Sequence, residues 1–132
     1  MSVDTIANML SMIKNAATAG NDSLDVFHSK ESKSICEVLK DAGYIEEVKV
    51  FKPKGKSHKM IHLQLAKQGD FIKINDIKRI SKPGRRVYKK VSEIHPSKGI
   101  YSTMVISTPQ GILSDQEARK RKLGGELICE VY

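Results

Sequence analysis

The segment that most restricts how this chain folds is residues 107–126, which the sequence predicts to hold a short helix between two strands. Ser114 stands three residues before Glu117, the spacing at which a serine and a glutamate cap a first helical turn reciprocally. Four consecutive basic residues then suit the negative end of the helix dipole, namely Arg119, Lys120, Arg121 and Lys122. Gly124 suits a left-handed residue that ends the helix. These signals predict a helix of roughly two to three turns.

The two ends of this segment carry the polar groups of a candidate binding surface. Before the helix, a strand-like run ends at Ser107 and Thr108, and residues 109–111 form a turn. After the helix, a glycine pair precedes Glu126. If the two ends meet in space, they present hydroxyls, backbone amides and a carboxylate, which can read unpaired bases and 2′-hydroxyls. A purely structural hairpin end with its caps is the alternative interpretation, and the spacing alone does not choose between them.

Length and composition limit the class of protein. The chain has 132 residues, enough for one compact unit or two small ones, and its 39% apolar content supports a core. No apolar run approaches the roughly 20 residues of a membrane span, and no signal peptide or transit leader is recognisable, so a cytoplasmic protein is the expectation. Cys36 and Cys129 lie far apart in apolar patterns and are expected to be small core hydrophobes.

The net charge of +8 is placed unevenly along the chain. Residues 1–66 hold nine basic and eight acidic side chains, whereas residues 67–132 hold fourteen basic and seven acidic ones. A polyanionic partner for the second half is the simplest reason. A membrane surface is the rival partner, but the sequence has no amphipathic helix with a basic face and aromatic anchors. With no Trp and 5% aromatic residues, extensive base stacking is not expected.

The first half reads as α-β-α-β-β, with strands predicted at residues 23–28, 44–51 and 60–65. The first helix starts at Asp4 or Thr5 and has one apolar face formed by Ile6, Met9, Leu10, Ile13 and Ala17. The second helix is capped by Ser29 and begins with Lys30. A lysine at the positive end of a helix favours a phosphate there, and a solvated polar turn is the alternative.

The second half reads as mostly β, with the short capped helix described above. A strand at residues 77–81, a turn, and a returning strand at residues 87–88 precede two further strands at 101–106 and 127–132. The turn has Pro83 and Gly84 at its centre, which is type II chemistry. The expected fold class is α+β with two small subdomains, an N-terminal α/β subdomain at 1–66 and a C-terminal β-rich, RNA-binding subdomain at 67–132.

A dense basic run lies around this turn. Between Lys78 and Lys90 there are seven basic residues and no acidic one: Lys78, Arg79, Lys82, Arg85, Arg86, Lys89 and Lys90. A solvated face usually mixes charges, so this density indicates phosphate contact. Tyr88 lies within the run, where its ring can support a ribose or base. Burial of the ring with an exposed hydroxyl is the alternative.

Motifs for catalysis or metal binding are not found. Gly55-Lys56-Ser57 resembles the end of a P-loop, but Val50 stands where that motif needs glycine. His58 and His62 are spaced like a helical zinc pair, but they fall in a strand pattern. We expect no enzyme, no cofactor and no metal site.

Two patterns together resemble the small-subunit ribosomal protein S8 family, bacterial type. In the last third the resemblance is carried by Ser107, Thr108, Gly111, Ile112, Leu113, Asp115, Ala118, Arg119, Gly124, Gly125 and Glu126. In the basic run it is carried by Ser81, Pro83, Gly84, Arg86 and Tyr88. One departure is Pro109, which stands where many bacterial relatives have a third hydroxyl after Ser-Thr.

The resemblance implies a structural constituent of the ribosome that binds the central domain of 16S rRNA directly. It implies a role in assembling the platform of the small (30S) subunit, beside neighbouring small-subunit ribosomal proteins and away from membranes. The alternative is a translational repressor that binds its own operon mRNA through the same surface. The candidate rRNA-binding residues are Ser107, Thr108, Gln110, Gly124, Gly125, Glu126, Tyr88, Arg86, Arg85, Lys82 and Lys30.

Glu126 is the most informative of these candidates. A carboxylate near phosphates costs free energy unless it accepts hydrogen bonds from base amino or imino groups or from a 2′-hydroxyl. We therefore expect recognition of an irregular RNA helix at Glu126 and generic affinity from the basic run.

Overall fold

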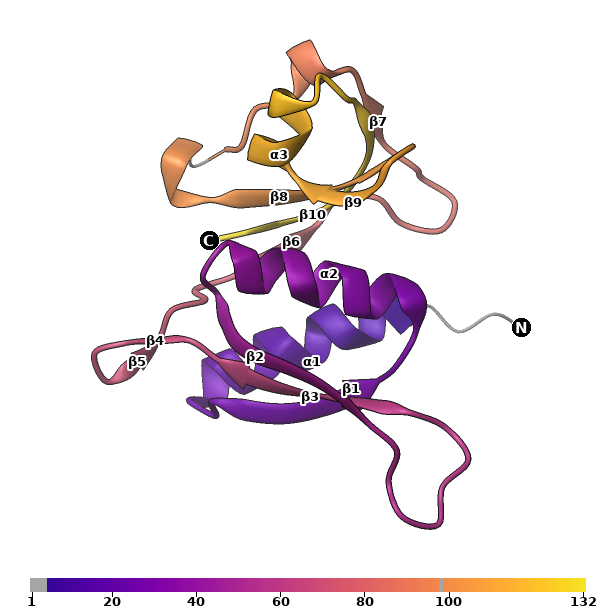
Figure 1. Cartoon of the computed structure of the whole chain (residues 1–132). Coiled ribbons are helices and arrows are strands. Elements are labelled where there is room, and N and C mark those ends of the chain that lie inside the picture. Colours follow the sequence, from indigo (N-terminus) through magenta and orange to yellow (C-terminus); the bar gives the residue numbers. More distant parts are fainter. Residues whose placement is uncertain (1–4, 98) are drawn as a thin grey trace. The chain divides into compact units, whose positions relative to one another are not determined.

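The computed structural model describes residues 5–97 and 99–132, which form two compact units. The first unit ends at Asn75 and the second runs from Asp76 to Tyr132 (Figure 1). The charge balance changes earlier, after residue 66, but the connection that follows stays with the first unit. It forms a small hairpin of β4 (Lys67–Gln68) and β5 (Phe71–Ile72), and the Lys73 N–H donates to the Ala66 carbonyl at 2.9 Å.

The first unit has the predicted element order α-β-α-β-β. The elements are α1 (Thr5–Ala19), β1 (Ser23–Phe27), α2 (Lys30–Asp41), β2 (Ile45–Phe51) and β3 (Met60–Leu65). The three strands form an antiparallel sheet in the order β1-β3-β2, and both helices lie on one side of it (Figure 1). Along the described residues no helix combines the length and apolar character needed to cross a membrane.

The core of the first unit lies between the helices and one face of this sheet. Alternate residues of β3 are fully buried, as the period of a strand with one covered face requires. The buried side chains come from both helices and the sheet, and include Met9, Leu10, Ile13, Ile35, Cys36, Leu39, Val26, Ile61, Leu63 and Leu65. Burial of each large aliphatic side chain stabilises the fold by about 1.5–3 kcal/mol.

The helix ends of the first unit follow from local chemistry. Ser29 caps α2 as predicted, because its hydroxyl oxygen accepts the Ser32 N–H at 3.0 Å. Gly43, with φ of +90°, follows the C-terminus of the same helix, where a left-handed residue is needed. Thr5 is the first described residue of α1, and the other predicted cap, Asp4, lies outside the described residues.

The second unit is mostly β with one short helix, as predicted. Its elements are β6 (Ile77–Arg79), β7 (Tyr88–Lys89), two 3-10 turns (Val91–Glu93 and Gly99–Tyr101), β8 (Thr103–Thr108), β9 (Gly111–Ser114), α3 (Asp115–Lys120) and β10 (Gly125–Val131). The antiparallel sheet has the order β6-β10-β8-β9, and β7 also pairs with β10. Its core contains Ile94, Met104, Ile106, Ala118 and Leu127. The fold class is therefore α+β.

The strands on either side of the basic turn differ from the sequence prediction. The turn closes as expected, with Lys82 and Arg85 exchanging backbone hydrogen bonds and Gly84 at φ +84°. The flanking strands, however, do not return against each other. Both pair with β10: β6 lies opposite residues 129–131 and β7 opposite residues 125–126. The predicted basic hairpin is therefore a loop whose two ends stay bonded to β10: Ile80 and Ser81 donate to it and Val87 accepts from it. We call residues 80–87 the basic loop.

Helix α3 also corrects the sequence prediction in part. It has six residues, fewer than two turns. Ser114 accepts the Glu117 N–H at 3.2 Å as predicted, but the Glu117 carboxylate accepts from Arg121 instead of completing the capping box. The left-handed residue that ends the helix is Lys122, with φ of 56°, and not Gly124.

The end of α3 is a Schellman motif. The Leu123 N–H donates to the Ala118 carbonyl at 2.9 Å, and the Lys122 N–H donates to the Arg119 carbonyl at 3.2 Å. Lysine pays a steric cost at this left-handed position that glycine would avoid.

Two buried carboxylates hold the second unit together. Glu130, 5% exposed, accepts from the Ser97 N–H at 2.7 Å and from the Ser102 hydroxyl at 2.8 Å. Asp115, 2% exposed, accepts from the Met104 N–H at 3.1 Å and from Arg119 Nη2 at 2.8 Å. A buried charge needs such partners, so each carboxylate fixes a loop or helix to the sheet.

Candidate nucleic-acid interface

Three of the predicted residues meet in one row across the sheet of the second unit. Strand β10 lies between β7 and β8, and Glu126 pairs directly with Tyr88 on one side and with Ser107 on the other. Side chains of directly paired residues in an antiparallel sheet project from the same face. We call these three residues the Glu126 row. The two ends of the 107–126 segment therefore do meet.

The Glu126 carboxylate is sheltered but not buried. Its side chain is 20% exposed, and its Oε2 lies 3.3 Å from Nη1 of the half-exposed Arg86. An ion pair with a half-exposed arginine contributes little stability. The carboxylate has two oxygens and thus keeps capacity to accept further hydrogen bonds. Tyr88 is 68% exposed, so its ring lies open to solvent and is not part of the core.

Gly124 and Gly125 allow the strands beside this row to approach closely. A Cβ on Gly125 would collide with the backbone carbonyl of Ser107, and one on Gly124 would lie 2.5 Å from the Lys89 carbonyl oxygen. Such contacts do not occur between real side chains and backbone, so both positions need glycine for space. The glycine pair thus sets the distance between Glu126 and its neighbours.

Adjacent hydroxyls on β8 have different surroundings. Thr108 is 9% exposed, and its Oγ1 donates to the Gly111 carbonyl at 2.7 Å and accepts the Gln110 N–H at 3.2 Å. The Ser107 hydroxyl makes no hydrogen bond to the described residues. Thr108 therefore organises the β8–β9 turn, whereas the Ser107 hydroxyl keeps its capacity to donate and accept hydrogen bonds. Pro109 lies exposed in that turn.

Arg121 contacts the candidate residue Gln110, which its place in the sequence did not predict. Its Nη1 donates to the Gln110 side-chain oxygen at 3.2 Å, and its Nε lies 3.2 Å from Glu117 Oε1. The guanidinium therefore connects the end of α3 to the turn before β9. The sequence signal was present, but a basic residue in a last helical turn is explained by the helix dipole alone.

Six of the seven basic residues of the run are exposed, and five of these six lie around the basic loop: Lys82, Arg85, Arg86, Lys89 and Lys90. The other two make contacts within the second unit. Lys78 lies over the Tyr132 ring, 5.6 Å from its centroid, and Arg79 Nε donates to the Ser81 carbonyl at 2.7 Å. The base of the loop is closed by Ser81, whose buried hydroxyl accepts the Val87 N–H at 2.9 Å.

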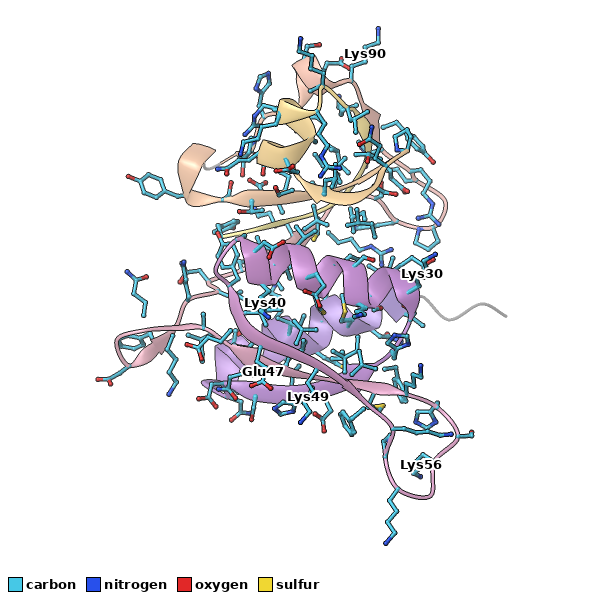
Figure 2. All side chains as sticks on the ribbon, viewed as in Figure 1. Lys30, Lys40, Glu47, Lys49, Lys56 and Lys90 are labelled. Atoms are coloured by element: carbon cyan, nitrogen blue, oxygen red, sulfur yellow. The ribbon has the colours of Figure 1, made fainter. Side chains whose placement is uncertain are left out.

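Lys30 belongs to the other unit. It is the first residue of α2 and is exposed there, where Figure 2 labels it. Lys30 is therefore not part of the unit that carries the Glu126 row.

Among the residues that the structure describes, the histidines and cysteines do not gather into a metal site. In the described parts of the chain, no three His, Cys, Asp or Glu side chains come together as a metal ion would require. His62 Nδ1 lies 2.7 Å from Asp25 Oδ1, so this histidine pairs with a carboxylate on the neighbouring strand. Both cysteines are fully buried, and burial is the main cause that raises the pKa of Cys36 and of Cys129 to about 12. The prediction that they are core residues is confirmed.

These observations define a small, basic α+β protein whose candidate site consists of hydrogen-bonding and cationic groups on a sheet. The family described as ribosomal protein S8 matches residues 4–132. The small ribosomal subunit protein uS8 of Nautilia profundicola is 41% identical over 129 residues, covering 98% of this chain and 98% of that protein. The proteins of the same name from Syntrophus aciditrophicus and Thermodesulfovibrio yellowstonii are 43% identical over 131 residues and 36% identical over 132 residues. They cover 98% and 100% of this chain, and 97% and 100% of their own lengths.

The chain belongs to the ribosomal protein S8 family. The resemblance noted in the sequence is thereby confirmed. A structural role in the small ribosomal subunit follows from this membership.

Proposed function

We propose that the chain binds 16S rRNA directly through the Glu126 row and the basic loop, and in this way helps to assemble the small subunit. The observation that carries the proposal is the position of Glu126. Its carboxylate is held between Ser107 and Tyr88 and beside Arg86, on a surface otherwise rich in cations. A carboxylate there repels phosphates, so its value lies in accepting hydrogen bonds from base edges or 2′-hydroxyls.

The two parts of the surface have different roles in this proposal. The exposed cations of the basic loop neutralise phosphates and release counterions, which gives affinity without sequence preference. Ser107 and Glu126 supply a donor and an acceptor at fixed positions, and Tyr88 supplies an exposed ring for a base or ribose. Thr108, Gln110, Gly124 and Gly125 keep these groups in place through the turn and the close strand contact.

Binding of a 16S central-domain fragment and of a random RNA duplex by the same variants tests this proposal. Glu126→Gln replaces one acceptor oxygen by a donor, and Ser107→Ala removes the hydroxyl. Each is expected to weaken binding of the fragment about 5-fold or more, because each loses a hydrogen bond of about 1–3 kcal/mol. The duplex is expected to keep its affinity within about twofold, since its binding depends on charge.

Glu117→Gln is the matched control. It changes the net charge by the same amount, but Glu117 is half-exposed on α3, where it pairs with Arg121, and lies outside the Glu126 row. Equal losses for both RNAs in Glu126→Gln, or equal effects of Glu117→Gln and Glu126→Gln on the fragment, would contradict the recognition role.

Repression of its own mRNA would use the same groups. Competition between the ribosomal fragment and the operon messenger for one labelled protein tests whether a single surface serves both RNAs. Simultaneous binding of the two would exclude the shared site.

A further inference from the structure

The sheet of the first unit has one face that neither of its helices covers. Helices α1 and α2 both lie on the opposite side, over Val26, Ile61 and Leu63 (Figure 1). Residues alternating with these therefore project from the other face. Figure 2 shows Glu47 and Lys49 on that side, away from the helices.

One cross-strand row on this open face is apolar. Met60 of β3 pairs directly with Phe27 of β1 and with Phe51 of β2, so the three side chains form a continuous row. Phe27 is 58% exposed, and the other two are partly exposed. The Phe27 ring also lies against His58, with 5.5 Å between ring centroids and a tilt of 53°. Two of the three phenylalanines of the chain are gathered here.

The connection beside this row is strongly cationic. Residues 52–59 join β2 to β3 directly at the paired Phe51 and Met60, and they include no acidic residue. Their four lysines are all exposed, namely Lys52, Lys54, Lys56 and Lys59. Figure 2 shows Lys56 on this connection, which extends beyond the end of the sheet.

The acidic residues of the same face lie on rows further from the connection. Asp25 and Lys49 flank His62 on the next row, and Asp25 is paired with His62 at 2.7 Å. Glu47 lies one row further still, opposite Gln64. The end of the sheet that carries the apolar row is therefore cationic, and this polarity favours an anionic ligand over a neutral apolar surface.

We propose that the row Phe27–Met60–Phe51, together with the lysines of residues 52–59, is a second RNA contact that holds an unpaired nucleotide. Its exposed rings would stack on a base or ribose, and the lysines would bind the adjoining phosphates, as on sheet platforms that bind single strands. The ligand class is a single-stranded RNA segment, read without strong sequence preference. This site rests on the proposed function only in taking RNA as the partner, since it shares no residue with the Glu126 row.

Binding of a short oligouridine to the full-length protein, followed by fluorescence anisotropy, tests this contact. Phe27→Ala is expected to weaken binding about 5- to 100-fold, the loss associated with one stacked base, and Phe27→Tyr is expected to restore it. The double variant Lys54→Gln/Lys56→Gln is expected to reduce the slope of log affinity against log salt by about 1.4. Phe71→Ala is the matched control, because Phe71 is 79% exposed in the same unit but lies on β5, outside the row.

Equal affinities of Phe27→Ala, Phe71→Ala and the unaltered protein would overturn the proposal. So would a photoreactive residue at position 27 that, in assembled small subunits, crosslinks to a protein and to no RNA. The outcome for this second contact can be distinguished from the outcome for the Glu126 row. Loss of oligouridine binding in Phe27→Ala with no effect of Glu126→Gln on the ribosomal fragment would support this contact and reject the proposed recognition role.

Discussion

At the scale of single residues, several groups of the second unit matter because of the atoms that surround them. Their residue type alone does not show this. Gly125 is needed because the Ser107 carbonyl occupies the place of a side chain. Thr108 and Ser107 are neighbours with similar hydroxyls, yet the Thr108 hydroxyl bonds within a turn and the Ser107 hydroxyl makes no hydrogen bond to the described residues. Local sequence does not distinguish such cases, because the partner atoms come from other strands.

Gly125→Ala is expected to destabilise the protein by about 2 kcal/mol or more, since overpacking against backbone cannot be relieved by a rotamer change. Gly124→Ala is expected to cost less, because its nearest backbone atom lies further away. Urea denaturation of each variant measures these differences.

Gly69→Ala is the control for this comparison. Gly69 has φ of +65° and no atom within 4 Å of an added Cβ, so only backbone strain of about 1 kcal/mol is expected. If Gly125→Ala and Gly69→Ala unfolded at the same urea concentration, the close-packing explanation would be contradicted.

At the scale of elements, the short helix α3 shows which signals act locally. The Ser114 cap formed where the sequence placed it, because a cap needs only residues three positions apart. The C-terminus of α3 lies two residues earlier than the glycine suggested, because Lys122 is the left-handed residue and Gly124 instead lies against β7. Gly124 is therefore needed for close packing against a neighbouring strand, and not for ending the helix.

Lys122→Gly is expected to stabilise the protein by about 0.5 kcal/mol, because relief of the left-handed conformation exceeds the added entropy of the unfolded chain. Lys120→Gly is the matched control, since it removes the same charge from the last turn of α3. There glycine is expected to cost about 1 kcal/mol. Thermal unfolding of both variants measures the two effects, and destabilisation by Lys122→Gly would contradict the strain at that residue.

At the scale of the whole molecule, the uneven charge is expected to make RNA binding depend on salt concentration. The second half of the chain holds fourteen basic and seven acidic residues, and the exposed cations cluster around the basic loop. Electrostatic binding of this kind loses affinity steeply as salt rises, with a slope set by the number of phosphates neutralised.

Lys82→Gln/Arg85→Gln is expected to lower that slope for duplex RNA by about 1.8, close to 0.9 per lost phosphate contact. The pair Lys40→Gln/Lys67→Gln removes the same charge from the first unit and is expected to leave the slope nearly unchanged. Filter binding across a salt series measures both. Equal slopes for the two double variants would mean that total charge, and not the basic loop, determines binding.

Much of the fold was predictable because its signals are local. Apolar periodicity located α1, α2 and β3, and Ser29 and Ser114 marked helix starts that the structure has. The small β4–β5 hairpin and strand β9 were missed, since two- to four-residue strands leave almost no periodic signal. The basic run was identified, but its pairing was not, because Pro83-Gly84 chemistry describes a turn and not the partner of the flanking strands.

The sequence by itself determined where the helices begin, the position of the Pro83-Gly84 turn, the uneven charge and the residues from which a site could be built. Those properties depend on neighbours a few positions apart, or on composition. Only the tertiary structure decided that β10 lies between β7 and β8, which puts Tyr88, Glu126 and Ser107 in one row. It likewise decided that Phe27, Met60 and Phe51 meet on an open sheet face. Strand register joins residues distant in the chain, and it is chosen by the burial of a whole sheet face and not by any short segment.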